Sequence, residues 1–184
     1  MAGHTGIRML SIGFVFSVFL STAEGQSGFP VSVRDAFDRT VTVRTHPHRI
    51  VSLAPSHTEI LFALGVGPEV VGVTIFSNYP PEARTRPVIG SYVMPNLEKI
   101  IALAPDLVVT GRDCGYEFVQ RLEALGIIVH ISNPKDLREL LITIDTIGRL
   151  TGHTAQAESL IASLNDQIQK IETRLKSVSH EQQP

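Results

Sequence analysis

Residues 49–65, RIVSLAPSHTEILFALG, decide the fold of this chain. The β-branched run at 50–53 predicts a short buried strand, and a helix is predicted to follow directly, from Pro55 to the glycine at position 65. Proline is common at the first helical position and glycine just after the last one. The spacing of Ser56 and Glu59 predicts a capping box at the start of the helix. The stretch is therefore expected to form a strand, a tight turn and a helix.

The same alternation continues along the chain. Apolar runs predict strands at 70–75, 86–90, 107–110 and 127–131, and helical spacing predicts helices at 97–104, 116–125 and 136–150. Strands that alternate with helices in this way form a parallel sheet covered by helices. The predicted fold class is therefore α/β, with a β-hairpin at 31–43 before the parallel-sheet lobe and one long amphipathic helix, 154–178, after it.

Composition and missing motifs exclude several classes of function. The chain has 16 Lys and Arg against 18 Asp and Glu, so it lacks the basic excess expected of a nucleic-acid binder. Its one cysteine, Cys114, cannot form an internal disulfide or a Cys-rich zinc site. It has no glycine-rich phosphate loop and no G-x-S-x-G nucleophile motif. We therefore expect no enzyme, no catalytic residue and no cofactor.

The seven histidines do not form an obvious metal motif. Only His46 and His48 are close in the sequence, and two ligands beside a proline are a weak metal site. His130 falls within an apolar strand, where we expect a hydrogen-bonded residue of the core or of the sheet edge. The sequence therefore predicts no metal centre.

The N-terminal segment has the composition of an export signal. Arg8 is followed by an apolar run at 10–20 and by small residues up to Gly25. The run is shorter than the roughly 20 apolar residues that span a bilayer. No cysteine lies near the expected cleavage point, so we expect export to the periplasm without a lipid anchor.

Three blocks carry a resemblance to a known family. RIVSLAPSHTEILFALG at 49–65, VVGVTIFSNYPPEA at 70–83 and NLEKIIALAPDLVVTG at 96–111 together resemble the N-terminal lobe of periplasmic binding proteins for cobalamin and ferric siderophores. These proteins are the helical-backbone class that serves ABC importers. The resemblance implies a substrate-binding component that captures cobalamin or a related corrinoid and delivers it to a membrane permease. Cobalamin would then be the transported ligand, with a ferric siderophore or haem as the alternative.

The resemblance also implies the site residues. Family members hold the ligand in a cleft between two lobes with aromatic side chains and loop backbone. Phe76 and Tyr92 take the aromatic positions here, although a core role for Phe76 and a surface role for Tyr92 would explain them equally well. A corrin is a large, mostly apolar ring, so contact with aromatic side chains is favourable. The remaining ligand-binding residues implied are Pro55, Ser56, Gly111, Arg112 and Asp113.

Glu98 is implied as the permease-docking residue. It matches the glutamate of the family's NLE motif, which binds an arginine pocket of the permease. A glutamate in the first turn of a helix is also favoured by the helix dipole alone, so both explanations stay open. The charged loop around Arg112 and Asp113 departs from what the resemblance implies and favours a different or decorated ligand.

The domain organisation follows from these segments. We expect a signal peptide at 1–25, a hairpin and lead-in at 26–48, the N-terminal lobe at 49–153, a spine helix at 154–178 and a polar tail at 179–184. In the family the long helix leads into a second lobe, which has no counterpart here. Two interpretations remain open: a truncated transport component, or a one-lobe interaction module outside transport that forms a homodimer through the long helix.

Overall fold

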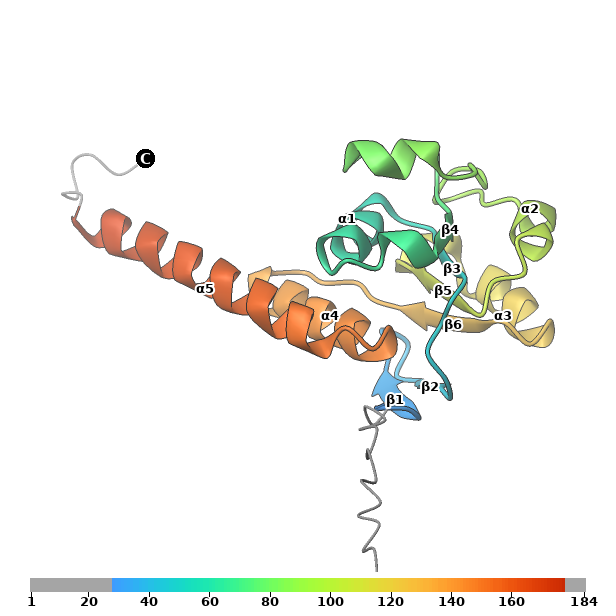
Figure 1. Ribbon diagram of the computed structural model, residues 1–184, viewed down its shortest axis with the longest axis horizontal. Coiled ribbons are helices and arrows are strands. Elements are labelled where there is room, and N and C mark those ends of the chain that lie inside the picture. The colour runs from blue at the N-terminus through green and yellow to red at the C-terminus, as the bar shows by residue number, and fades with distance from the viewer. Residues whose placement is uncertain (1–27, 178–184) are drawn as a thin grey trace, which may run out of the picture.

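A four-stranded parallel sheet forms the centre of the molecule. The computed structural model describes residues 28–177 (Figure 1). Strand β3 (Ile50–Ser52) pairs in parallel with β4 (Val70–Gly72) on one side and with β5 (Leu107–Thr110) on the other. Strand β6 (Ile128–Ile131) pairs with β5, so the order is β4-β3-β5-β6. The predicted α/β class with a parallel sheet is confirmed.

Helices cover both faces of this sheet because both faces of its strands are apolar. In β3, Ile50 and Val51 are fully buried and belong to separate apolar clusters on opposite faces. One cluster packs against α1 (Pro55–Ala63) and α4 (Leu137–Leu150). The other packs against α2 (Leu97–Ala102) and α3 (Tyr116–Ala124). Short 3₁₀ turns lie between these elements, at η1 (Gly67–Glu69), η2 (Pro81–Thr85) and η3 (Arg112–Cys114).

The strand predicted at 86–90 is only an isolated pairing. Val73 pairs with Val88 through two backbone hydrogen bonds, Val73 N–H to Pro87 O at 3.0 Å and Ile89 N–H to Val73 O at 2.9 Å. Ile75 N–H also donates to Gly90 O at 2.9 Å, but Pro87 has no N–H to donate, so the ladder does not extend back along β4. The neighbouring strand β4 ends at Gly72 and not at residue 75.

The capping box predicted at the start of α1 is wrong. Ala54 is the N-cap residue, and no side chain of the described chain caps the helix there. Pro55 occupies the first helical turn, so Ser56 lies inside the helix and its hydroxyl is displaced from the cap position. Side-chain caps occur instead at α2, where Asn96 Oδ1 accepts from Lys99 N–H at 2.8 Å, and at α4, where Asp136 caps.

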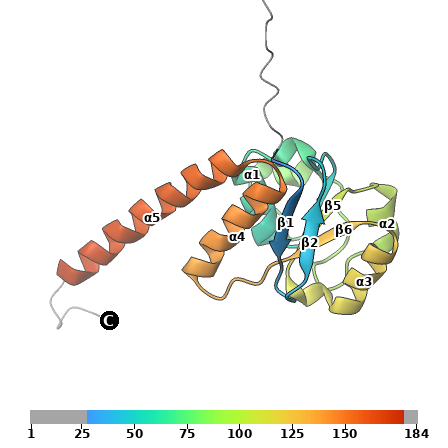
Figure 2. The same ribbon diagram turned by 90° about the horizontal axis from the view of Figure 1, so that it is seen from below.

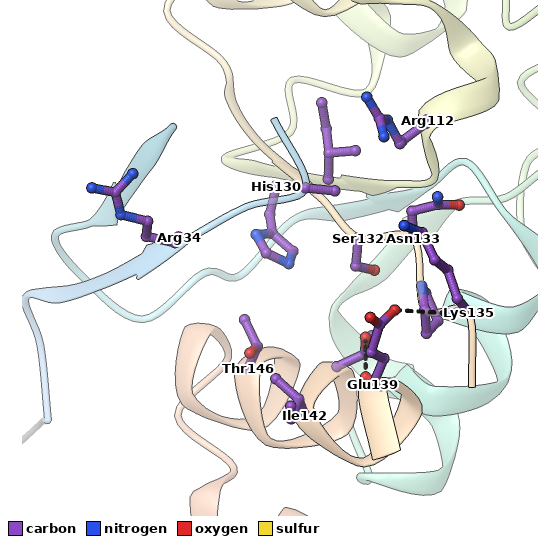
Figure 3. Close-up of a pocket in the computed structure, with 13 residues that line it drawn as sticks. Arg34, Arg112, His130, Ser132, Asn133, Lys135, Glu139, Ile142 and Thr146 are labelled. Carbon is purple, nitrogen blue, oxygen red and sulfur yellow. Dashed lines mark hydrogen bonds between the residues drawn. The ribbon is translucent and has the colours of Figure 1, made fainter. Parts of the chain in front are cut away.

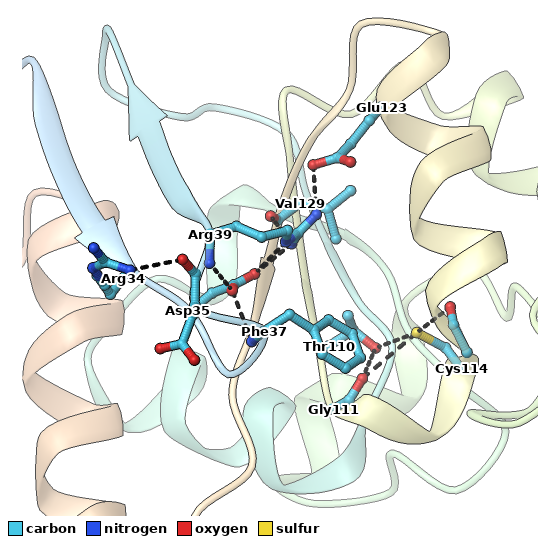
Figure 4. A network of polar contacts seen from close by, with 11 residues as sticks. Arg34, Asp35, Phe37, Arg39, Thr110, Gly111, Cys114, Glu123 and Val129 are labelled. Atoms are coloured by element: carbon cyan, nitrogen blue, oxygen red, sulfur yellow. Dashed lines mark hydrogen bonds and ion pairs between the residues drawn. The ribbon is translucent and has the colours of Figure 1, made fainter.

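The antiparallel hairpin of β1 (Val31–Arg34) and β2 (Thr40–Val43) is tied to the sheet by a charged network (Figure 4). Arg39 forms an ion pair with the buried Asp35 and donates to Glu123 Oε1 on α3 at 2.7 Å and to Val129 O on β6 at 3.3 Å. Burial alone would raise the pKa of Asp35, but the hydrogen bonds from Arg39 and from the Phe37 N–H hold it below its ordinary value. The hairpin is therefore fixed against β6.

The long helix α5 (Thr154–Ser177) crosses α4 closely and then projects away from the lobe (Figures 1 and 2). A Cβ at Gly148 of α4 would lie 2.4 Å from the Cβ of Ala157, so the crossing requires glycine there. Leu160 and Leu164 pack against the core, whereas Ile171 is 58% exposed. The inner part of the apolar stripe thus packs on the flank of the lobe. Homodimerisation through the outer part stays a prediction.

Several predicted segments lie outside the described residues. These are the signal peptide at 1–25, the last position of the spine helix at 178 and the tail at 179–184. Within residues 28–177, no helix combines the length and the apolar character needed to cross a membrane.

Candidate functional site

The carboxyl ends of the four parallel strands form one edge of the lobe, here called the strand-end edge. Ligands of open α/β sheets bind outside this end of the strands. The loops that follow β4, β3, β5 and β6 lie side by side there because the strands are adjacent in the sheet. The loops after β4, β5 and β6 contain Phe76, Gly111 and Ser132, and Ser56 lies in the first turn of α1, which begins shortly after β3.

A groove of about 550 Å³ runs along the middle of the strand-end edge and is called the edge groove. It brings together three of the predicted site residues, Ser56, Gly111 and Asp113, with the segment 132–137 that follows β6. Pro55 is part of the first turn of α1 and does not line the groove. Three separate segments of the chain therefore form the middle of the predicted ligand-binding surface.

The two predicted aromatic residues lie at the β4 side of the edge. The rings of Phe76 and Tyr92 meet edge to face, with centroids 6.5 Å apart. Phe76 is 53% exposed, so it is not a core residue, and Tyr92 is 37% exposed. Exposed apolar side chains continue around them, and together these residues are called the β4 patch: Ile75, Phe76, Tyr79, Tyr92, Val93 and Met94. Exposed apolar groups gathered in this way commonly mark a binding surface.

Four buried hydroxyls hold the loop that carries Phe76. Thr58 Oγ1 lies 2.9 Å from both Ser52 Oγ and Ser77 Oγ, and Ser77 Oγ lies 3.0 Å from Thr74 Oγ1. This hydroxyl network joins β3, α1 and the loop after β4. Because all four side chains are at most 4% exposed, their mutual hydrogen bonds are largely protected from water.

Two buried histidines lie under the other half of the edge. His57 Nε2 on α1 forms a hydrogen bond with Ser132 Oγ in the loop after β6. This bond joins α1 to that loop. Burial, together with the charge of the neighbouring His130, lowers the pKa of His57 to about 4, so its imidazole is neutral at pH 7. His130 is also neutral, because burial lowers its pKa to about 4 as well.

Arg112 does not join the edge groove. Its guanidinium carbon lies 4.6 Å from the centroid of the Phe37 ring, so the side chain turns toward the hairpin. There it lines a second cavity between the hairpin and α4. The predicted turn Gly111-Arg112-Asp113 is therefore split, with its glycine and aspartate on the edge groove and its arginine outside it. Cys114, two residues further on, is buried, and Thr110 Oγ1 lies 3.3 Å from its Sγ.

The sequence reasoning missed the loop after β6. Ser132, Asn133 and Lys135 line both cavities, yet none of them was among the predicted site residues. The signal was available, because the rule that ligands gather at strand carboxyl ends applies to the predicted strand at 127–131 as much as to the other three.

Neither Glu98 nor the histidine pair His46 and His48 lines the edge groove. Glu98 is exposed in the first turn of α2, which lies on the opposite side of the lobe from α5 (Figures 1 and 2). The rings of His46 and His48 stack with centroids 5.0 Å apart. No group of three or more His, Cys, Asp or Glu side chains between residues 28 and 177 could hold a metal ion.

Comparisons with a family model and with curated relatives point to the same family of binding proteins. A family model described as periplasmic binding protein matches residues 50–184. The chain is 33% identical to an uncharacterised ABC transporter substrate-binding lipoprotein of Bacillus subtilis over 84% of this chain and 50% of that protein. It is 34% identical to a cobalamin-binding protein of Halobacterium salinarum over 81% of this chain and 41% of that protein. It spans about half of these curated relatives.

A solved structure shares the fold. The periplasmic haem-binding protein RhuT of Roseiflexus superposes with a TM-score of 0.66 at 32% identity, over 72% of this chain and 52% of that one.

Proposed function

Because this chain belongs to the periplasmic binding protein family, we propose that it acts as a substrate-binding component of an ABC importer and that its strand-end edge binds cobalamin or a related corrinoid. The observation that carries this proposal is the exposed edge-to-face pair of Phe76 and Tyr92 beside the polar edge groove. A corrinoid has a broad apolar ring with polar substituents at its rim. The ring suits the β4 patch, and the substituents suit Ser56, Asp113 and the backbone of Gly111.

Relatives support the choice of ligand. The cobalamin-binding relative matches four fifths of this chain, and haem binding by RhuT makes haem the second candidate. Both ligands are large planar rings. Haem has two carboxylates at one end of its ring, whereas the edge groove contains the carboxylates of Asp113 and Asp136 and one cation, Lys135. The excess of negative charge repels the haem carboxylates at short range, so the groove favours a corrinoid over haem.

The test is a titration of the full chain with cyanocobalamin, haemin and a ferric siderophore, followed by absorbance and calorimetry. We expect saturable binding of cyanocobalamin and weaker binding of the other two. A matched control is Tyr116→Ala, which removes an exposed aromatic side chain of α3 outside the β4 patch. Binding of haemin alone, or equal losses in Phe76→Ala and Tyr116→Ala, would contradict the proposal.

The permease partner is proposed to dock at Glu98. The side chain is exposed on a short helix and does not line the edge groove, so it is accessible for a contact that does not involve the ligand. Glu98→Ala is expected to reduce ligand delivery to the permease without weakening ligand binding. Glu117→Ala is the matched control, because Glu117 is also an exposed carboxylate in the first turn of a helix. Equal loss of delivery in both variants would exclude a specific role for Glu98.

Export to the periplasm is part of the same proposal. The apolar run at 10–20 and the small residues up to Gly25 support cleavage by a signal peptidase without lipid attachment. N-terminal sequencing and mass spectrometry of the exported protein test this directly. A mature N-terminus at Gln26 is expected, whereas retention of Met1 or an added lipid mass would contradict it.

A further inference from the structure

A second cavity lies behind the loop that follows β6, on the hairpin side of the lobe (Figure 3). Its volume is about 260 Å³. This corresponds to the space of about nine water molecules in the liquid. Residues of the hairpin, the end of β6 and α4 enclose it, so we call it the hairpin cavity. Segment 132–135 separates it from the edge groove and lines both.

The hairpin cavity contains a buried imidazole that lacks a partner. His130 is 1% exposed, and neither of its ring nitrogens has a hydrogen-bond partner within the described chain. This corrects the expectation of a hydrogen-bonded histidine. Figure 3 shows the imidazole between β1, which carries Arg34, and α4, which carries Thr146. A neutral imidazole has one N–H donor and one acceptor nitrogen, and leaving both unpaired in a buried site is costly. A hydrogen-bond acceptor in the cavity would remove the part of that cost that comes from the ring N–H.

Cationic side chains outnumber anionic ones around this cavity. Arg34, Arg112 and Lys135 line it, against the single carboxylate of Glu139. That carboxylate already accepts the Lys135 backbone N–H at 2.8 Å. Arg34 Nη1 donates to Asp38 O at 2.9 Å, which uses one of the five N–H donors of a guanidinium. The local charge therefore favours an anion.

Neutral donors complete the lining. The hydroxyls of Ser132 and Thr146 belong to it, on the loop after β6 and on α4. Hydroxyls and an imidazole N–H can donate to the same oxyanion that guanidinium groups attract. The volume accommodates a compact group and excludes a macrocycle the size of a corrin.

From these observations we infer that the hairpin cavity is a binding site for a small oxyanion of the carboxylate or phosphate class, with the buried His130 ring as its N–H donor. The positive charges of Arg34, Arg112 and Lys135 around the cavity attract the anion from different sides. The site does not rest on the proposed corrinoid function, because its lining includes neither Phe76 nor Tyr92, although it shares segment 132–135 with the edge groove.

The experiment titrates the full chain, without corrinoid, with inorganic phosphate and separately with succinate at constant ionic strength. The His130 ring signals are followed by NMR, and the midpoint of thermal unfolding is recorded in parallel. We expect saturable shifts of the His130 signals and a rise in the unfolding midpoint with at least one of the two anions, since a ligand that binds only the folded state stabilises it. Shifts that fail to saturate through tens of millimolar of both anions would overturn the inference and indicate a cavity filled by water.

Variants make the test specific. Arg34→Gln removes an exposed cation of the lining and should weaken anion binding about threefold, because one attracting charge beside the cavity is lost. Arg138→Gln is the matched control, because Arg138 is an exposed cation of α4 that does not line the cavity. Because both side chains are exposed, neither substitution endangers folding. Equal affinity in wild type and Arg34→Gln would place the anion elsewhere and overturn the assignment.

Discussion

The β4 side and the β6 side of the same sheet edge differ in chemistry. The β4 side presents exposed aromatic rings above a network of neutral hydroxyls. The β6 side combines two buried imidazoles with exposed charged side chains, including Asp113 and Lys135. One parallel sheet thus positions an apolar and a polar surface next to each other, because each loop is set by its own strand and helix. Such a division suits a ligand with an apolar face and polar substituents.

The largest expected effect is a loss of folding stability at acid pH, and it arises on the β6 side and not on the β4 side. His57 and His130 both have a pKa of about 4 in the folded protein, below the ordinary 6.5. Between pH 6.5 and 4 the unfolded chain therefore binds protons that the folded one does not, so stability falls as the pH falls. The loss approaches about 3 kcal/mol for each histidine by pH 4. Urea unfolding at a series of pH values measures it.

Two variants locate the source of this pH dependence. Replacing His130 by Phe should remove one histidine's share of the slope, whereas Thr173→Val, which changes no titratable group, should leave the slope unchanged. The depressed pKa of Asp35 acts in a lower window, because its stabilisation is lost only as the pH falls below about 4. A stability curve that stays flat from pH 7 to 5 would contradict burial of neutral histidines on the β6 side.

The next effect concerns the hydroxyl network on the β4 side. Thr58→Val keeps the side-chain shape but removes a hydroxyl that contacts both Ser52 and Ser77. We expect a loss of about 1–3 kcal/mol in the free energy of unfolding, without a change in its pH dependence. Thr173→Val is the control, since its hydroxyl bonds only the Gln169 carbonyl on the exposed part of α5. Similar losses in the two variants would mean that the network adds nothing beyond an ordinary hydroxyl.

Ligand affinity gives the third effect. Phe76→Ala should weaken cyanocobalamin binding about tenfold, since an aromatic contact contributes on the order of 1 kcal/mol beyond the buried area. Because Phe76 is half exposed, the stability of the lobe should change little. Isothermal titration calorimetry together with urea unfolding separates the two quantities. A large loss of stability with unchanged affinity would reverse the assignment of the β4 patch.

The smallest effect is expected at Asp113. Asp113→Asn keeps the shape of the side chain and removes one exposed charge of the edge groove, so cyanocobalamin affinity should change by no more than about threefold. The same substitution should strengthen haemin binding, because a repulsive carboxylate is lost. Binding titrations with both ligands measure the ratio. A much larger loss for cyanocobalamin than in Phe76→Ala would make the polar groove, and not the aromatic pair, the main contact.

Much of the fold could be predicted from the sequence because it depends on local patterns. The β-branched run at 50–53 and the proline and glycine around the next helix mark a strand and a helix without knowledge of their neighbours. The capping box failed because two local signals competed, and Pro55 set the helix start one residue before Ser56. The strand at 86–90 failed because pairing depends on a partner and on an N–H that Pro87 lacks.

The candidate site was less predictable because it depends on side-chain direction. Gly111, Arg112 and Asp113 are consecutive, yet the contact between Arg112 and Phe37 directs the arginine to another cavity. That contact depends on how the hairpin docks, which no local pattern reveals. For the same reason, the apolar neighbours of His130 predicted its burial but not the lack of a partner for its ring nitrogens.

The docked hairpin also has a consequence for self-association. β4 and β6 are the outermost strands of the sheet, and exposed outer strands invite pairing with another chain and aggregation. Ala36 N–H donates to Ile131 O at 2.8 Å on one border, and the segment around Val88 pairs with Val73 on the other. Both borders are therefore shielded, so a second copy of this lobe could not extend the sheet there. Strand pairing between copies, a common first step of sheet aggregation, is therefore disfavoured at both borders by contacts within the lobe itself.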